Sequence, residues 1–179
     1  MTIGYMHGRF QPPHKGHLHI WKQIIKECDE IWIGIVNPLR EQVDNKSLSD
    51  EILKSVKKAR DPKNNPFSFS ERYQMIYDTL LAEGVPPEKI RITPAFSYYD
   101  HKNWKDFMPP TKNSIIYMPI KDPHHTSKVI MYEKNGWKVK KVKLKSGFSG
   151  TEVRKLIPKG NWKQLVPVGT QKFLEERFS

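Results

Sequence analysis

The sequence predicts an α/β fold: a Rossmann-like open parallel sheet of about five strands with helices on both faces. Short apolar runs of strand length alternate along the chain with longer segments of helical periodicity, which is the pattern of such sheets. The first 36 residues read as strand, loop, helix and strand, a βαβ unit. The second of these strands, IWIGIV at 31–36, is apolar throughout, as expected of a strand covered on both faces.

The first strand is predicted over 3–7 and is followed by a turn-rich stretch with two glycines and two prolines at 8–17. A helix is predicted over 18–30. It carries one apolar stripe at helical spacing, made of Leu18, Trp21, Ile24, Ile25 and Cys28.

Residues 38–66 interrupt this rhythm with a polar stretch that contains three prolines and a predicted short helix around 49–59. Because the α/β alternation resumes afterwards, we expect an excursion within a single domain, 1–179, rather than a linker. The next helix is predicted over 69–83. It begins at a capping box formed by Ser68 and Glu71.

The rest of the chain supplies the remaining strands and helices. Strands are predicted over 89–93, 114–118 and 137–142. Helices are predicted over 126–135, from Ser149 or Thr151 to about 158–160, and over 170–178. The aromatic stretch 94–113 is predicted to be irregular, with a short helix near Trp104.

Composition narrows the class of protein and the compartment. The 179 residues carry 31 Lys and Arg against 19 Asp and Glu, a net charge of +12 that favours anionic partners: nucleic acid, acidic membranes or phosphorylated small molecules. A solvated lysine-rich surface explains the same surplus. With 11% aromatic residues, wholesale disorder is excluded. The chain has a single cysteine, no bilayer-spanning apolar run and no signal-peptide pattern, so we expect a cytoplasmic protein without membrane contact.

The motif GRFQPPHKGH, at 8–17, lies between the first strand and the first helix, where open α/β sheets bind ligands. His14 and His17 are three residues apart and share one face of the helix start. Gly16 permits close approach to the backbone. Two imidazole donors beside a helix N-terminus suit a phosphate group. Capping or packing is the alternative role of the histidines, and a zinc site lacks further ligands at suitable spacing.

A second motif, SGTEVR at 149–154, opens a later helix. The hydroxyls of Ser149 and Thr151, together with Arg154 one turn on, suit polyphosphate oxygens. A capped helix with a surface arginine is the alternative interpretation.

Together, the two motifs resemble the signatures of the HxGH nucleotidyltransferase superfamily. With NPFSFSER at 65–72 between them, they are similar to the nicotinamide-mononucleotide adenylyltransferases of the archaeal type and of bifunctional Nudix proteins. The resemblance implies that ATP and nicotinamide mononucleotide give NAD and pyrophosphate, with Mg²⁺ on the phosphates and no metal held by protein ligands. It is also consistent with a homo-oligomer.

The resemblance also implies roles for individual residues. His14, His17 and Arg154 would be catalytic, with His17 at the α-phosphate. The other nucleotide contacts would come from Gly8, Arg9, Phe10, Gly16, Lys121, Ser149 and Thr151.

The acceptor would contact Trp104, Asn103 and Asp100, with Trp104 stacked on the pyridine ring. A core aromatic is the alternative role for Trp104, and an ordinary turn residue for Asp100. Another phosphorylated acceptor, or CTP in place of ATP, stays open. A basic nucleic-acid-binding module is the more distant alternative, and no recognition signature supports it.

Overall fold

The computed structural model describes residues 1–36, 57, 61–96, 103–120, 123–143 and 147–178. Five parallel strands form one sheet in the order β3-β2-β1-β4-β5. They are β1 (Ile3–Gly8), β2 (Glu30–Val36), β3 (Ile90–Ala95), β4 (Ser114–Pro119) and β5 (Lys138–Val142). The predicted fold class is confirmed, and each predicted strand is present.

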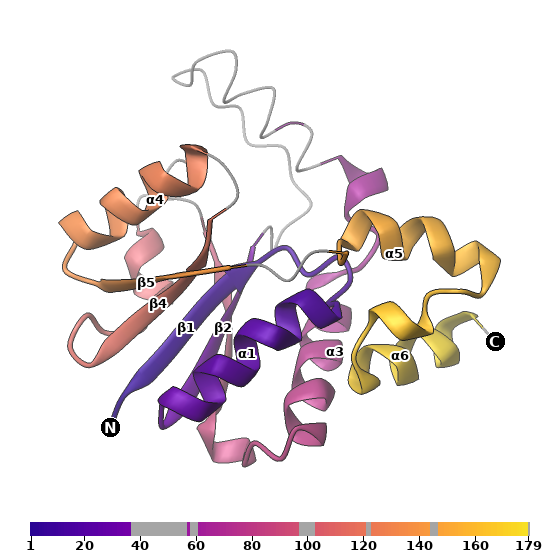
Figure 1. Cartoon of the computed structure of the whole chain (residues 1–179), viewed down its shortest axis with the longest axis horizontal. Coiled ribbons are helices and arrows are strands. Elements are labelled where there is room, and N and C mark those ends of the chain that lie inside the picture. Colours follow the sequence, from indigo (N-terminus) through magenta and orange to yellow (C-terminus); the bar gives the residue numbers. More distant parts are fainter. Residues whose placement is uncertain (37–56, 58–60, 97–102, 121–122, 144–146, 179) are drawn as a thin grey trace.

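Helices surround this sheet (Figure 1). The α-helices are α1 (Lys15–Glu27), α3 (Phe69–Ala82), α4 (Pro123–Lys134), α5 (Gly150–Leu156) and α6 (Val168–Phe178). Short 3-10 turns occur at Pro62–Asn64, Pro87–Lys89, Trp104–Phe107, Ile157–Lys159 and Lys163–Leu165. Within the described ranges, no helix has the length and apolar character that would let it cross a membrane.

The two faces of the sheet bury different side chains. Met6 of β1 packs with α1 and α3 in one core cluster, whereas its neighbour Tyr5 packs with α4 in another. This alternation follows from the two-residue period of a strand. Covering both faces explains why β2 is apolar throughout.

A third cluster joins α5 and α6 to α3 (Figure 1). Gly169 of α6 meets the backbone of α3 so closely that a Cβ atom there would lie 2.3 Å from the amide nitrogen of Thr79. This packing places the helix that carries the second motif beside the start of α1.

The predicted boundaries agree to within a few residues. The capping box of α3 is confirmed, because Ser68 Oγ accepts from the Glu71 amide at 3.2 Å and Glu71 Oε2 accepts from the Ser68 amide at 2.6 Å. The first helix begins at Lys15 rather than at 18, so His17 lies in its first turn. Apart from Lys57, the short helix predicted around 49–59 lies outside the described residues.

Candidate active site

The first motif lies at the centre of the sheet. β1 ends at Gly8 and is flanked by β2 on one side and β4 on the other, so the strand order reverses at this position. Ligands of open α/β sheets bind at the carboxyl ends of the strands on either side of such a reversal. The loop from Arg9 to His14 crosses this point and leads into α1.

The two histidines of the motif form one unit. Their rings stack with centroids 3.6 Å apart, and the His14 amide donates to His17 Nδ1 at 3.1 Å. Since Nδ1 accepts, a neutral His17 ring carries its proton on Nε2. The edge contact of Phe10 with the His17 ring, at 4.8 Å between centroids, further fixes the ring plane. His17 thus holds an oriented N–H donor.

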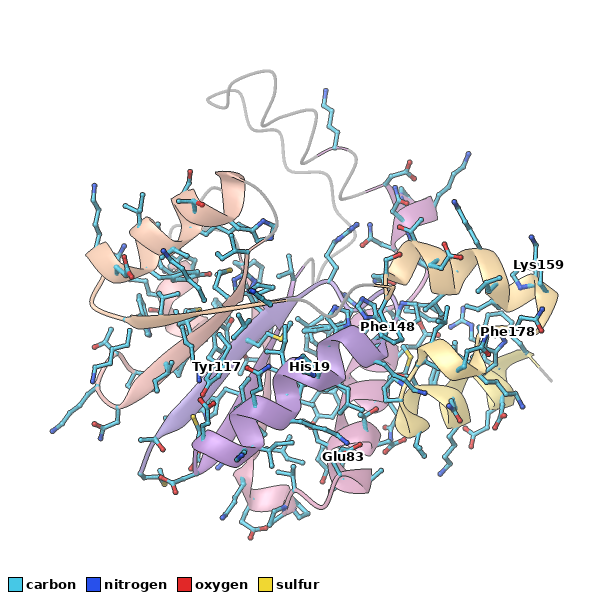
Figure 2. The ribbon with its side chains drawn as sticks, viewed as in Figure 1. His19, Glu83, Tyr117, Phe148, Lys159 and Phe178 are labelled. Atoms are coloured by element: carbon cyan, nitrogen blue, oxygen red, sulfur yellow. The ribbon has the colours of Figure 1, made fainter. Side chains whose placement is uncertain are left out.

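Gly16 allows this pair to pack against the rest of the site. A Cβ atom at Gly16 would lie 2.9 Å from His14 Nδ1 and 3.2 Å from the Cβ of Phe148. Figure 2 shows Phe148 between the starts of α1 and α5. A side chain at position 16 would therefore separate the first motif from the segment that leads into the second.

The second motif contacts the first directly, although 143 residues separate the bonded pair. Arg154 Nη1 donates to the Gln11 carbonyl at 2.5 Å, and Nη2 contacts Thr151 Oγ1 at 3.3 Å. Gly150 lies against the same carbonyl, which a Cβ atom would approach to 2.7 Å. Ser149 caps α5, its Oγ accepting from the Glu152 amide at 3.0 Å.

Two arginines make the site electropositive. Burial lowers the pKa of Arg9 and, together with the charge of Arg9, lowers that of Arg154. The two guanidinium groups lie close enough to repel each other, so an anion bound beside them would relieve that repulsion. Imidazole N–H, guanidinium and hydroxyl donors together suit the oxygens of a polyphosphate.

Buried polar side chains hold the loop of the first motif in place. The side chain of Gln11 makes two hydrogen bonds to the backbone of Phe67. Its Nε2 donates to the Phe67 carbonyl at 2.8 Å, and its Oε1 accepts from the Phe67 amide at 2.9 Å. Arg72, 2% exposed, donates through Nη1 to the carbonyls of Arg9 and Val36. Sequence reasoning did not single out Gln11. Gln11 lies within the first motif, but nothing local in the sequence indicates its bonds to Phe67.

Of the predicted acceptor residues, the structure describes Trp104 and Asn103. Trp104 is 7% exposed and packs against Tyr132 and Trp137, at 6.0 and 5.7 Å between ring centroids, so in this structure it is a core aromatic. Asn103 is exposed, and its backbone carbonyl accepts from the backbone amide of Asp106 at the start of a 3-10 turn. Asp100 and Lys121 lie outside the described residues. A stacking role for Trp104 stays a prediction.

Comparison with known proteins relates the whole chain to nucleotide-transferring enzymes. A family model described as cytidylyltransferase-like matches residues 5–156. The nicotinamide-nucleotide adenylyltransferase of Methanococcus aeolicus is 31% identical, over 94% of this chain and 86% of that protein. The phosphonoformate cytidylyltransferase of Streptomyces viridochromogenes is 28% identical, over 97% of this chain and 90% of that protein.

A solved structure shows the same fold. It is a bifunctional NMN adenylyltransferase/ADP ribose pyrophosphatase from Francisella tularensis, complexed with AMP and a manganese ion. The TM-score is 0.70 at 25% identity, and the match covers 98% of this chain but 48% of the other. The chain thus spans about half the length of that bifunctional protein.

Proposed function

The chain belongs to the cytidylyltransferase-like family and is a nucleotidyltransferase; from this we propose that it joins ATP and nicotinamide mononucleotide to give NAD and pyrophosphate. The observation that carries the proposal is the contact between the two motifs. That contact brings Arg154 of α5 to the loop between Arg9 and His17, at the carboxyl end of β1, and in this proposal the three side chains surround the phosphates.

The chemistry needs no nucleophile from the protein. An oxygen of the mononucleotide 5′-phosphate attacks the α-phosphorus of ATP, and the bond from that phosphorus to the bridging oxygen breaks, releasing pyrophosphate. The protein positions both substrates and stabilises the charge on the oxygens. In this scheme His17 donates from Nε2 to an α-phosphate oxygen, Arg154 and Thr151 bind the β- and γ-phosphates, and Arg9 neutralises the phosphate of the acceptor. The His14 ring supports His17 by stacking on it.

Mg²⁺ is part of the proposal through the nucleotide. The donors of the two motifs are imidazoles, guanidinium groups and hydroxyls, which bind phosphate oxygens rather than a hard cation. They fit a metal–nucleotide complex, in which Mg²⁺ would neutralise charge on the phosphates. In that complex the protein residues would hold the phosphates.

A second candidate is cytidylyl transfer to a small phosphonate or phosphate. The phosphonoformate cytidylyltransferase aligns with 97% of the chain. The roles proposed for the two motifs involve only phosphate groups, so they apply to either base. The chemistry is the same, with CTP in place of ATP.

The test is Mg²⁺-dependent pyrophosphate release from ATP or CTP with a panel of phosphorylated acceptors. We expect release with ATP and nicotinamide mononucleotide, and a loss of about 10²–10³-fold in kcat for His17→Ala. His19→Ala is the matched control. This exposed histidine on the same helix (Figure 2) contacts Gln23 and should keep full activity.

Each alternative predicts a different result. Release with CTP and a phosphonate alone would replace the first proposal with the second candidate. No release with any pair, combined with polyanion binding that weakens steeply with salt, would favour the nucleic-acid module.

A further inference from the structure

A second recess lies at the carboxyl edge of the sheet, between β1–β3 and α4. Its empty space is about 410 Å³, a figure that includes the part open to solvent. Its described lining combines aromatic and methionine side chains with a few polar groups: Tyr5, His7, Val36, Ala95, Phe96, Met108, Lys128, Met131 and Tyr132. None of these residues is acidic.

The hydroxyl of Tyr5 is the first sign that the recess binds a ligand. Tyr5 is fully buried, and its oxygen has no hydrogen-bond partner among the described residues. Gly34 leaves room for this hydroxyl, since a Cβ atom there would lie 2.1 Å from the oxygen. A buried hydroxyl is costly unless it is hydrogen-bonded, so a group that enters the recess gains a ready partner.

His7 and Tyr132 form the second polar feature. His7 Nε2 lies 2.9 Å from the Tyr132 hydroxyl. Burial, with the nearby charges of Lys128 and His125, lowers the pKa of His7 to about 3, so the ring is neutral near pH 7. Burial raises the pKa values of Tyr5 and Tyr132, so both hydroxyls keep their protons. When His7 donates from Nε2, the Tyr132 hydrogen is available to a ligand.

The recess is connected to the first motif. His7 is two residues before Arg9 along the chain. Arg72 Nη1 bridges the Arg9 carbonyl, at 2.8 Å, and the carbonyl of Val36, at 2.7 Å, and Val36 lines the recess. A substrate whose phosphate lies at Arg9 therefore has this recess beside it.

We propose that the recess binds the end of the acceptor substrate away from its reacting phosphorus group, and that it binds a carboxylate at this end more tightly than a neutral group such as a carboxamide. The carboxylate accepts from the hydroxyls of Tyr5 and Tyr132 and pairs with the Lys128 ammonium. His7 is a positioning residue that turns the Tyr132 hydrogen toward the carboxylate. The inference rests on the proposed nucleotidyl transfer and selects among its acceptors. Tyr5, Tyr132 and Lys128 can all donate hydrogen bonds, and a carboxylate offers several acceptor sites to such a set of donors.

The test compares acceptors that differ at this end, by calorimetric binding in the absence of ATP. Nicotinic acid mononucleotide is paired with nicotinamide mononucleotide, and phosphonoformate with methylphosphonate. We expect the carboxylate-bearing member of at least one pair to bind about tenfold more tightly. Tyr5→Phe and Lys128→Gln should abolish that preference without changing the KM for the nucleotide.

Tyr117→Phe is the matched control. It removes a hydroxyl from a buried tyrosine on the other face of the sheet (Figure 2), where that group donates to Glu27 Oε2. It should keep the full preference, and His7→Gln should reduce it through Tyr132. Thermal melts of each variant separate lost binding from lost folding.

The binding assay and the pyrophosphate assay fail independently. Absence of a carboxylate preference in both pairs, or a preference that Tyr5→Phe and Lys128→Gln leave intact, overturns the recess proposal even if NAD is formed. If no acceptor in the panel supports pyrophosphate release, the proposed function is overturned. A carboxylate preference in the binding assay that the variants remove would still support the recess proposal.

Discussion

Arg154 connects the two motifs through one side chain. Its guanidinium group donates to the Gln11 carbonyl and contacts Asn64 Oδ1 at 3.2 Å and Thr151 Oγ1 at 3.3 Å. Arg154→Lys keeps the charge but loses the planar fork, which a single ammonium does not reproduce. We expect kcat/KM for the nucleotide to fall about 10–10²-fold, measured by pyrophosphate release. Lys155 is an exposed neighbour of Arg154 on α5, and Lys155→Ala should leave kcat/KM for the nucleotide unchanged.

Gln11 supports the site by holding the loop rather than by binding substrate. Gln11→Met keeps the size of the side chain but leaves both the amide and the carbonyl of Phe67 without their partner. We expect the free energy of unfolding in urea to fall by about 2–4 kcal/mol, since two buried backbone groups lose hydrogen bonds.

Gln74→Met is the comparison for this substitution. Gln74 is exposed on α3 and donates to Asp78, so its loss should cost less than about 0.5 kcal/mol. Equal destabilisation by the two substitutions would contradict the role given to Gln11.

For single residues, the sequence predicts side-chain contacts only between positions that lie close together along the chain. His14 and His17 were predicted to share one face because the helix period relates neighbours three residues apart, and their rings do stack. The pairing of Gln11 with Phe67 spans 56 residues, and no local pattern reports it. The sequence leaves open whether Trp104 packs in the core or stacks on a substrate, because an aromatic residue in a loop packs inward or outward depending on tertiary contacts.

The helices α3 and α6 are held together by a close backbone approach. Gly169→Ala would put a methyl group within 2.7 Å of the Asp78 carbonyl carbon and closer still to the Thr79 amide, neither of which is free to rotate away. We expect a loss of about 1–3 kcal/mol in the free energy of unfolding, read from the urea midpoint.

The control for this packing is on the same helix. Lys172 is exposed on α6, so Lys172→Ala should change the urea midpoint of unfolding little. If Gly169→Ala were as stable as Lys172→Ala, the close approach of α6 to α3 would be wrong.

Elements were predicted well where the local signals were strong. The capping box at Ser68 and the apolar run at 31–36 gave the start of α3 and the extent of β2 within one residue. The start of α1 was missed because its first turn is made of Lys15, Gly16 and His17, which carry no apolar stripe. Its N-terminus is instead fixed by the amide of His14 bonding to His17.

In the whole molecule, the order of the strands in the sheet brings segments that are far apart in the sequence close together in space. Because β1 is central, the loop after it can contact both the helix that follows the last strand and the segment that precedes α3. Alternating strands and helices predict the layers, but not which side chains of the two motifs meet. That depends on how α5 and α6 pack on α3.

His7, near the carboxyl end of the central strand β1, makes the stability of the fold depend on pH. The pKa of His7 falls from its ordinary value of 6.5 to about 3 in the folded protein. Below pH 6.5 the unfolded chain therefore binds a proton that the folded chain excludes, and the stability contributed by neutral His7 is lost as the pH falls from 6.5 towards 3. Near neutral pH and above, that contribution is fully present.

The expected size of this effect follows from about 1.4 kcal/mol per pH unit, which gives about 2 kcal/mol between pH 6.5 and pH 5. Urea unfolding at pH 7.5 and pH 5.0 measures it, with His7→Gln as the non-titrating reference. The lowered pKa values of Glu27 and Asp29 act mainly below pH 4.5 and are common to both proteins. The wild type should therefore lose about 2 kcal/mol more than His7→Gln over this interval. Equal losses would mean that His7 takes up its proton while folded, and that the recess around it is open to water.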